Sequence, residues 1–231
     1  MLEVAGLDAG YGNVQVLHGL DLAVAGGEVL CLMGRNGAGK STALKAIMGL
    51  VRPASGTVRL DGVRLDGLPA HEVPRHGLGY VPQGRRLFAE LTVAENLEIG
   101  LMTRGHGAST RERVLGLFPR LRERLGQVSG TLSGGDQQML AIARALCLEP
   151  RVLLLDEPTE GLQPSMITLI RDTVLALKAT GVATILVEQR VDAALSLADR
   201  IAFVVTGRIA ETLPAAGLAP DAPAFRAHVG V

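Results

Sequence analysis

The sequence has little cysteine, no net charge and no long apolar run. Its two cysteines, Cys31 and Cys147, both lie in apolar stretches, so we interpret them as core residues and expect no disulfide framework. The five histidines lack the spacing of metal ligands, which argues against a structural zinc site. These features are typical of a cytosolic protein.

The absence of net charge excludes the usual signature of a nucleic-acid-binding protein. The 23 lysines and arginines balance the 23 aspartates and glutamates, so nothing indicates a nucleic-acid or acidic partner. The richest apolar segment, residues 139–155, is interrupted by Arg144, Glu149 and Arg151, and we expect no transmembrane helix. The start, MLEVAGLDAG, lacks the basic and apolar regions of a signal peptide.

Apolar residues make up 48% of the 231 residues, enough for a sizeable core. Strand-like runs open the chain in the order LEVAGL, VQVLHGLDLAV and EVLCLM, and SGTVRLDGV has the pattern of a hairpin. Residues 92–149 have helical patterning, with breaks at Gly105, Gly107 and Pro119. We expect this region to be a helical subdomain inserted into a single domain that spans residues 1–231.

Strands return after the helical region. The runs RVLLLD, VATILVE and RIAFVV alternate with helical segments at residues 165–179 and 191–198. Alternation of strand and helix predicts a parallel sheet covered on both faces, and hence an α/β fold. The tail after Leu213 is rich in alanine and proline, and is expected to form a short packed helix or to fray.

The segment GRNGAGKS, residues 34–41, fits the P-loop pattern G-x-x-x-x-G-K-[ST] between a predicted strand and a predicted helix. Its glycines let backbone N–H groups form an anion nest, and the helix N-terminus adds partial positive charge. Lys40 can reach the outer phosphates, and Ser41 offers a hydroxyl to Mg²⁺. The alternative is a glycine turn with a solvated Lys40. The residues expected to bind the nucleotide are Gly34, Arg35, Asn36, Gly37, Ala38, Gly39, Lys40, Ser41 and Thr42.

Two adjacent carboxylates, Asp156 and Glu157, follow an apolar strand in LLLDEPTEGLQP. Ligands bind at the carboxyl ends of parallel strands. We expect VLLL to lie next to the strand that carries the P-loop, so that Asp156 can hold Mg²⁺ directly or through water. Glu157 can orient or deprotonate a water aimed at the γ-phosphate. Alternatively, the pair caps the next helix, with Pro158 at its start.

A second glycine motif, LSGGD at residues 132–136, precedes the helical run QQMLAIARALCLEP. Serine and glycines at a helix N-terminus form an anion site. A second anion site of different design makes sense if it serves the nucleotide of a partner chain. The alternative is a glycine loop with Ser133 as the helix N-cap.

The ordered set of motifs resembles the nucleotide-binding subunits of ABC transporters over nearly the whole chain. An early aromatic, Tyr11, is followed by the P-loop, Gln83 in YVPQG, LSGGDQQ and LLLDEP. The resemblance implies the ABC ATPase fold, in which a P-loop NTPase sheet carries an N-terminal antiparallel β subdomain and a helical insertion. It also implies ATP hydrolysis coupled to transport, with ATP and Mg²⁺ bound.

The resemblance assigns further roles. Tyr11 would stack on adenine, although it can also be a half-buried strand residue. Gln83 would contact Mg²⁺ and water, and Ser133, Gly134 and Gly135 would face the γ-phosphate across a head-to-tail dimer that encloses two ATP molecules. The expected magnesium ligands are Ser41, Gln83 and Asp156.

Three residues depart from the usual family pattern. Gln189 in ILVEQR stands where a histidine is usual. An amide can hydrogen-bond the γ-phosphate but cannot take a proton, so Glu157 is the expected general base and Gln189 a positioning residue, or merely a polar strand-end residue. Gln163 replaces the loop aspartate, which puts signalling across the dimer through that residue in doubt, and Asp136 replaces the signature glutamine.

These departures resemble one branch, the importers of branched-chain amino acids, amides and urea. YVPQGRRLF and DEPTEGLQPS are most similar to the urea-importer subunit, whereas amino-acid importers more often carry glutamate at the position of Gln83. The implied partners are a sister ATP-binding subunit, two membrane permease subunits and a periplasmic binding protein, at the cytoplasmic face of the inner membrane. Arg85 and Arg86 would face the permease, or form a solvated charge pair.

Other classes fit less well. Non-transport ABC ATPases of DNA repair or the ribosome often have two cassettes or coiled-coil insertions, and the neutral charge argues against nucleic acid. An ordinary P-loop kinase would leave LSGGDQQ unexplained. An exporter subunit stays open because the membrane partner sets the direction. The resemblance implies that this chain never contacts the substrate, so its residues indicate the substrates of its relatives and not a binding pocket.

Overall fold

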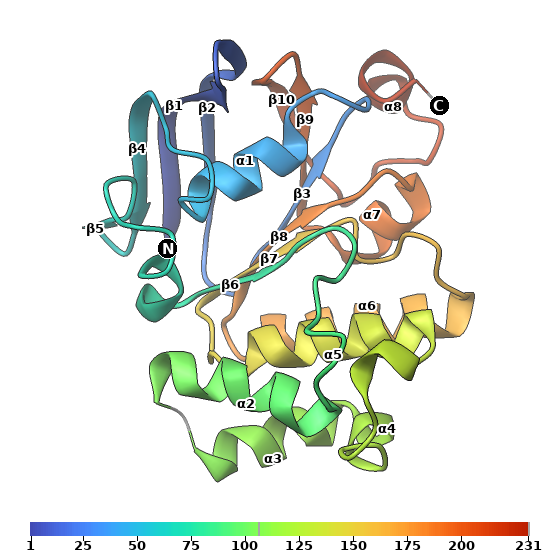
Figure 1. Ribbon diagram of the computed structural model, residues 1–231. Helices are drawn as coiled ribbons and strands as arrows, with labels where there is room; N and C mark the ends of the chain where they lie inside the picture. Colours follow the sequence, from blue (N-terminus) through green and yellow to red (C-terminus); the bar gives the residue numbers. More distant parts are fainter. Residues whose placement is uncertain (106, 231) are drawn as a thin grey trace.

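The computed structural model describes residues 1–105 and 107–230, and two sheets form its framework (Figure 1). The first sheet is antiparallel, with strand order β2-β1-β4-β5. Its strands are β1 (Leu2–Tyr11), β2 (Val14–Val24), β4 (Ser55–Leu60) and β5 (Val63–Arg64). Alternating apolar residues of β1 point into the core, as expected for a sheet with one buried face. The predicted N-terminal antiparallel sheet is therefore confirmed.

The second sheet has six strands in the order β10-β9-β3-β8-β7-β6. The strands are β3 (Val29–Met33), β6 (Leu78–Val81), β7 (Val152–Asp156), β8 (Ala183–Val187), β9 (Arg200–Val205) and β10 (Arg208–Pro214). Every residue of β3, β7 and β8 is buried, which explains their unbroken apolar sequences. Five strands are parallel, and β10 pairs antiparallel with β9 at the edge.

Two features of this sheet differ from the prediction. The strand β7 was expected beside β3, but β8 lies between them. A crossover connection can pass over a position in the sheet, so strand order does not follow from chain order. The edge strand β10 was not predicted, because its half-exposed pattern gives no continuous apolar run.

Helices cover both faces of the larger sheet. The helix α1 (Lys40–Ile47) lies between the two sheets, and α5 (Gly134–Leu146), α6 (Pro164–Ala179) and α7 (Val191–Leu197) lie on the opposite side (Figure 1). The remaining helices are α2 (Val93–Arg104), α3 (Ala108–Leu117), α4 (Pro119–Arg122) and α8 (Pro223–His228), with 3-10 turns η1 (Val73–His76) and η2 (Ser129–Thr131).

The sequence anticipated several details of this arrangement. The predicted breaks are helix boundaries: Gly105 ends α2, Gly107 precedes α3 and Pro119 begins α4. Both Cys31 and Cys147 are buried, as predicted. The chain's tail does form a packed helix, since Phe225 of α8 is fully buried. None of the described helices is both long enough and apolar enough to span a bilayer.

Gly207, in the turn between β9 and β10, joins the P-loop to both sheets. Its N–H donates to the carbonyl of Ala38 at 2.8 Å, and its carbonyl accepts from the N–H of His18 at 3.0 Å. Its φ is +73°, and a Cβ here would overlap the carbonyl oxygen of Val16. Only glycine fits this left-handed position at this closeness.

We predict that Gly207→Ala destabilises the protein far more than Gly62→Ala. Gly62 also has a positive φ, +83°, but a Cβ there would meet nothing within 4 Å. The control should lose about 1 kcal/mol of unfolding free energy from backbone strain, whereas Gly207→Ala should lose roughly 3 kcal/mol or more through steric overlap. Chemical denaturation measures both, and equal losses would contradict the packing role of Gly207.

Candidate functional site

The P-loop connects the end of β3 to the start of α1. Gly34, Gly37 and Gly39 have φ values of 152°, 78° and 108°, which turn the backbone in ways open to glycine. Lys40 is 5% exposed, and its Nζ donates to the carbonyls of Gly34 at 2.7 Å and Arg35 at 3.0 Å. The alternative of a glycine turn with a solvated lysine is therefore wrong.

Lys40 is the buried cation of this site. Burial lowers the pKa of its ammonium group, and the nearby carboxylates of Glu157 and Asp156 oppose that shift. The loop, the helix N-terminus and Lys40 thus form a phosphate-binding geometry.

Asp156, the last residue of β7, lies beside the P-loop although its strand is not adjacent to β3. Ser41 Oγ donates to Asp156 Oδ1 at 2.9 Å, and the Tyr80 hydroxyl donates to Oδ2 at 3.3 Å. Burial raises the pKa of Asp156, and these hydrogen bonds partly offset the shift. A serine hydroxyl beside a buried carboxylate is the oxygen donor set that suits Mg²⁺, so these residues fit the ion implied by the sequence.

Glu157 has a strained backbone that aims it away from the strand. Its φ of +51° is unusual for a non-glycine residue, and its N–H donates to the carbonyl of Val187 on β8 at 3.0 Å. The next helix, α6, begins only at Pro164, with Gln163 as its N-cap. The alternative that Asp156 and Glu157 cap this helix is therefore wrong.

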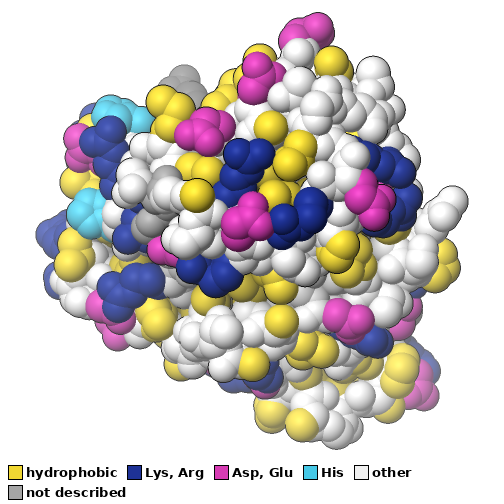
Figure 2. Space-filling view, turned by 90° about the horizontal axis from the view of Figure 1, so that it is seen from below, with side chains coloured by type: hydrophobic (Ala, Val, Ile, Leu, Met, Phe, Trp, Pro, Cys, Tyr) yellow, Lys and Arg dark blue, Asp and Glu magenta, His cyan; other side chains and the backbone are white. Residues whose placement is uncertain are grey.

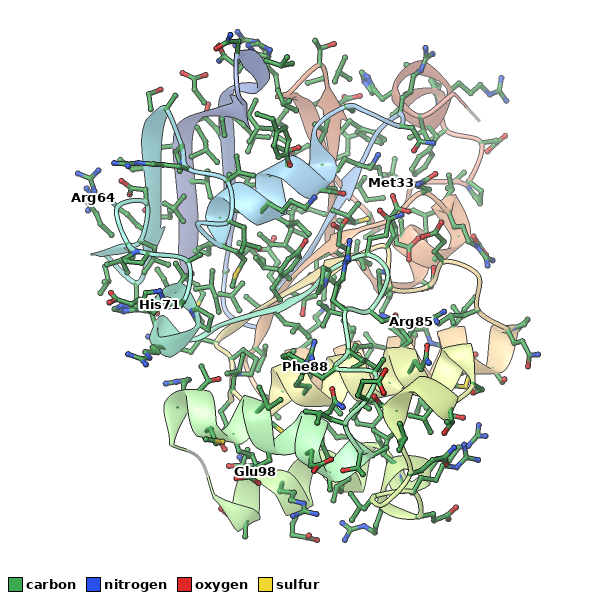
Figure 3. All side chains as sticks on the ribbon, in the orientation of Figure 1. Met33, Arg64, His71, Arg85, Phe88 and Glu98 are labelled. Atoms are coloured by element: carbon green, nitrogen blue, oxygen red, sulfur yellow. The ribbon has the colours of Figure 1, made fainter. Side chains whose placement is uncertain are left out.

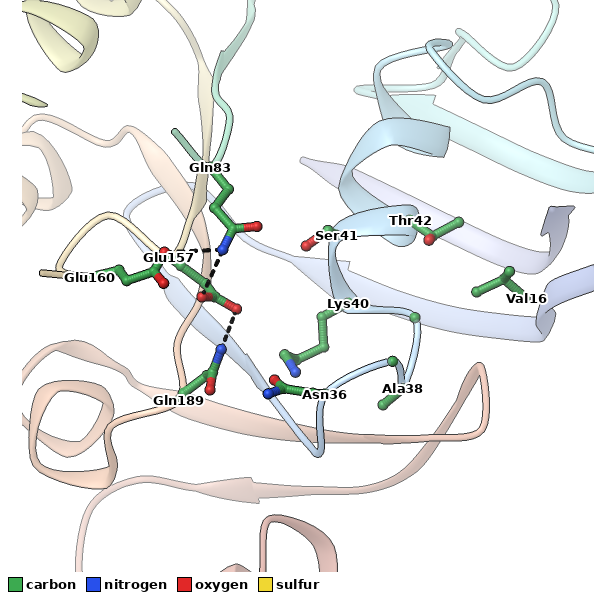
Figure 4. A pocket seen from close by; sticks show the side chains of 12 residues that line it. Val16, Asn36, Ala38, Lys40, Ser41, Thr42, Gln83, Glu157, Glu160 and Gln189 are labelled. Atoms are coloured by element: carbon green, nitrogen blue, oxygen red, sulfur yellow. Dashed lines mark hydrogen bonds between the residues drawn. The ribbon is translucent and has the colours of Figure 1, made fainter. Parts of the chain in front are cut away.

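Two glutamine amides meet at Glu157 (Figure 4). Gln189 Nε2 donates to Glu157 Oε1 at 2.6 Å, and Gln83 Nε2 donates to Glu157 Oε2 at 3.3 Å. Gln83 also donates to Glu160 Oε2 at 3.0 Å. Glu160 was missed from the sequence, although it lies three residues after Glu157.

These glutamines and glutamates face the P-loop across a cavity of about 520 Å³. The cavity is lined by Val16, residues 36–42, Gln83, Glu157, Glu160 and Gln189. The structure thus brings together the P-loop, the proposed general base and both glutamines, although they come from four separate stretches of sequence. We call these lining residues the nucleotide cavity.

Tyr11 and the signature residues lie outside the nucleotide cavity. Tyr11 ends β1 and is 48% exposed, so it is a strand residue at the surface. Ser133 is the N-cap of α5: its Oγ accepts from the N–H of Asp136 at 3.2 Å and donates to Asp136 Oδ2 at 2.6 Å. Within the single chain, Ser133 is therefore the N-cap of α5, as in the alternative interpretation of LSGGD.

Asp136 itself is almost fully buried and charge-paired. It is 1% exposed, and its carboxylate contacts Arg124 at 2.8 Å and Arg120 at 3.7 Å. These arginines come from α4 and the turn after it, and the sequence pattern gave no sign of them. The signature loop is consequently fixed to the helical region by an ion pair.

Arg85 and Arg86 lie between the sheet and the helical region. Both have positive φ, 67° and 49°. Arg85 donates to Gln137 Oε1 at 3.0 Å, and Arg144 of α5 donates to the Arg86 carbonyl at 2.8 Å while stacking over Phe88. Figure 3 labels Arg85 and Phe88 at this junction. Arg85 is thus bonded within the chain and is not a freely solvated charge.

The described residues on the face at the helical end of the molecule carry both charges (Figure 2). In Figure 2, basic and acidic side chains lie beside each other on this face, with apolar side chains scattered among them. Such mixed charge gives no continuous basic stripe that would follow a phosphate backbone. The view agrees with the neutral composition.

The chain is similar to known transport proteins over nearly its full length. Residues 17–160 match the family described as ABC transporter. The chain is 46% identical over 211 residues to the high-affinity branched-chain amino acid transport ATP-binding protein BraG of Pseudomonas aeruginosa, covering 90% of this chain and 91% of that protein. It is 41% identical over 214 residues to the probable branched-chain amino acid transport ATP-binding protein LivF of Archaeoglobus fulgidus, with 91% and 90% covered.

Solved structures agree with the sequence relatives. The dimeric structure of a bacterial ABC transporter cassette superposes with a TM-score of 0.84 at 27% identity, covering 94% of this chain and 100% of that chain. Fold, P-loop and sequence similarity all point to the same proteins. The chain belongs to the ABC transporter family, and it is an ATP-binding subunit that hydrolyses ATP.

Proposed function

We propose that the chain powers an importer of branched-chain amino acids or related small nitrogen compounds. The observation that carries this proposal is the 46% identity, over 90% of this chain, to a branched-chain amino acid transport ATP-binding protein. The chain would act as one ATP-binding domain over residues 1–231, with the helical subdomain at about 92–149 inserted in it. It would lie at the cytoplasmic face of the inner membrane, beneath two permease subunits fed by a periplasmic binding protein.

Glu157 is the proposed general base. Gln83 and Gln189 each donate to a different oxygen of its carboxylate, which fixes its orientation but leaves each oxygen a further lone pair for water. Gln189 occupies the usual histidine position and cannot itself take a proton. Lys40 and the P-loop N–H groups bind and orient the phosphates, so that water held by Glu157 lies in line with the γ-phosphate.

The proposed magnesium ligands are Ser41, Asp156 and Gln83. When bound, Mg²⁺ would offset negative charge on the β- and γ-phosphates. Ser41 and Asp156 are already hydrogen-bonded to each other at 2.9 Å, so this part of the site is preformed. The side-chain oxygen of Gln83 would join them from the opposite side of the nucleotide cavity.

The proposed partner is a sister ATP-binding subunit, either a second copy of this chain or a different chain, in a head-to-tail dimer. In that dimer Tyr11 would stack on adenine, consistent with its exposed position at the end of β1. Ser133, Gly134 and Gly135 would face the γ-phosphate bound by the partner.

Two substrates are distinguished by specific observations. The 46% identity to an amino-acid transport protein supports branched-chain amino acids. Gln83 and the segments YVPQGRRLF and DEPTEGLQPS support urea, because they resemble the urea-importer subunit. The permease would dock near Arg86 and Phe88, which line a groove of about 230 Å³ with Arg144.

We predict that Lys40→Ala weakens ATP binding at least about tenfold, because it removes a desolvated cation from the phosphates. Lys178→Ala is the matched control, since it removes the same charge from an ion pair with Asp199 outside the nucleotide cavity. Equilibrium titration with a fluorescent ATP analogue measures both. Equal ATP affinities for the two variants would contradict the role of Lys40 in ATP binding.

Glu157→Gln should bind ATP but hydrolyse it at least about 100-fold more slowly, because an amide cannot accept the proton from water. Gln189→Ala should cost less, because it removes only a positioning contact. Steady-state hydrolysis and size-exclusion chromatography with ATP test this: the first variant should accumulate as a dimer. Hydrolysis at the parental rate by Glu157→Gln would contradict the general-base assignment. If Gln189→Ala hydrolysed ATP more slowly than Glu157→Gln, Gln189 would be the more important of the two residues.

Uptake of labelled leucine and labelled urea should separate the two substrates. Cells that lack this chain should lose one uptake, and the parental chain but not Lys40→Ala should restore it. Loss of leucine uptake would assign amino acids, and loss of urea uptake would assign urea. If neither uptake changes, the importer proposal fails in favour of an export or non-transport role.

A further inference from the structure

Glu188 is a buried carboxylate to which the proposed mechanism gives no role. It follows β8, is 3% exposed, and forms no ion pair with any lysine or arginine among the described residues. Burial raises its pKa, while hydrogen bonds from Thr159 and the backbone N–H groups of Gln189 and Arg190 oppose the shift. A buried carboxylate without a cation is costly unless hydrogen bonds satisfy it.

The partners of Glu188 come from two loops. Thr159 Oγ1, itself 2% exposed, donates to Glu188 Oε1 at 2.5 Å. The N–H of Gln189 donates to Oε2 at 3.2 Å. Thr159 lies two residues after Glu157, and Gln189 directly follows Glu188, so one buried carboxylate joins the loop after β7 to the loop after β8.

These contacts close a ring that includes Glu157 and Gln189. The chain runs from Glu157 to Thr159, the hydroxyl of Thr159 bonds Glu188, the chain continues to Gln189, and the Gln189 amide returns to Glu157 at 2.6 Å. One side of the ring is buried and the other lines the nucleotide cavity. The buried side fixes the spacing of the two loops, whereas the exposed side can rearrange around a nucleotide.

We propose that the Thr159–Glu188 pair is a positioning device that holds the Gln189 amide at Glu157 for ATP hydrolysis. The inference rests on the proposed role of Glu157 as general base. Glu188 is buried and does not line the nucleotide cavity, so it acts only through Gln189 and the loop that carries Glu157. Without the pair, both loops keep their strands but lose their common spacing, and the geometry of the attacking water is lost with it.

The chain offers a matched control in Thr184. It is a fully buried threonine in β8, and its hydroxyl has no hydrogen-bond partner among the described residues. Thr184→Val and Thr159→Val therefore remove the same group from two buried sites. Only Thr159→Val breaks the contact with Glu188, and Thr159→Ser should restore it.

The test is a double-mutant cycle on the full chain assembled with its partner subunits. Thr159→Val should lower kcat for ATP hydrolysis by on the order of tenfold with KM little changed, because water is misplaced while phosphate binding is kept. Glu188→Leu should do the same, because its apolar side chain can accept a hydrogen bond from neither loop. Thr184→Val and Thr159→Ser should match the parent, and Thr159→Val with Gln189→Ala should be no slower than Gln189→Ala alone.

Independent effects would overturn the proposal. If the losses in kcat caused by Thr159→Val and Gln189→Ala multiply in the double variant, Thr159 does not act through Gln189. The same conclusion follows if Gln189→Ala alone leaves kcat unchanged. A fall in melting temperature without a fall in kcat would make the pair purely structural. Glu157→Gln is measured in the same assay. If this variant hydrolyses ATP at the parental rate, the general-base assignment fails as well. If it does not hydrolyse ATP, but the losses in kcat from Thr159→Val and Gln189→Ala multiply, only the positioning role is contradicted.

Discussion

The concentration of negative charge at the carboxyl ends of β7 and β8 is the constraint on which the site depends. Asp156 ends β7, and Glu157, Glu160 and Glu188 lie in the loops that follow β7 and β8. Lys40 is a buried cation that interacts with Asp156 and Glu157. Carboxylates this close repel one another. The chain offsets this with neutral donors: hydroxyl groups serve the buried Asp156 and Glu188, and amides serve Glu157 and Glu160 at the cavity. Neutral donors hydrogen-bond the carboxylates without neutralising their negative charge, so the carboxylates can still bind a metal ion or a proton.

The backbone positions these groups through a few contacts between segments far apart in sequence. Gly207 binds the P-loop to β2, and the N–H of Glu157 binds the loop after β7 to β8. The positive φ of Glu157 is strained and is retained because the parallel register of β7 and β8 determines it from both sides. Rigid strands thus carry a strained loop, which fixes the direction of the Glu157 side chain.

The sequence predicts the elements and the motif residues well, because both depend on local pattern. Buried strands such as β7 are unbroken apolar runs, and Gly105 and Pro119 mark helix ends through backbone chemistry. The order of β3, β8 and β7 could not be predicted, since periodicity contains no information on which strands pair. The same limit hid Glu160, Thr159 and the arginine partners of Asp136: each owes its role to a neighbour at least 12 positions away in the chain. The prediction that Asp156 lies beside the P-loop is correct although the predicted strand order is wrong, because the carboxyl ends of all parallel strands share one edge of the sheet.

Replacing the usual histidine by Gln189 changes what the site can do with a proton. An imidazole can be charged or neutral, whereas an amide is always neutral and always offers two N–H donors. Gln83 and Gln189 then present the same group to Glu157 from opposite sides, and neither competes with it for a proton. Gln83 leads directly into the segment that Arg85 and Arg144 bind to α5. A shift of the helical region would therefore move one of the two amides and leave the other, so the orientation of Glu157 depends on the relative position of the helical region and the sheet.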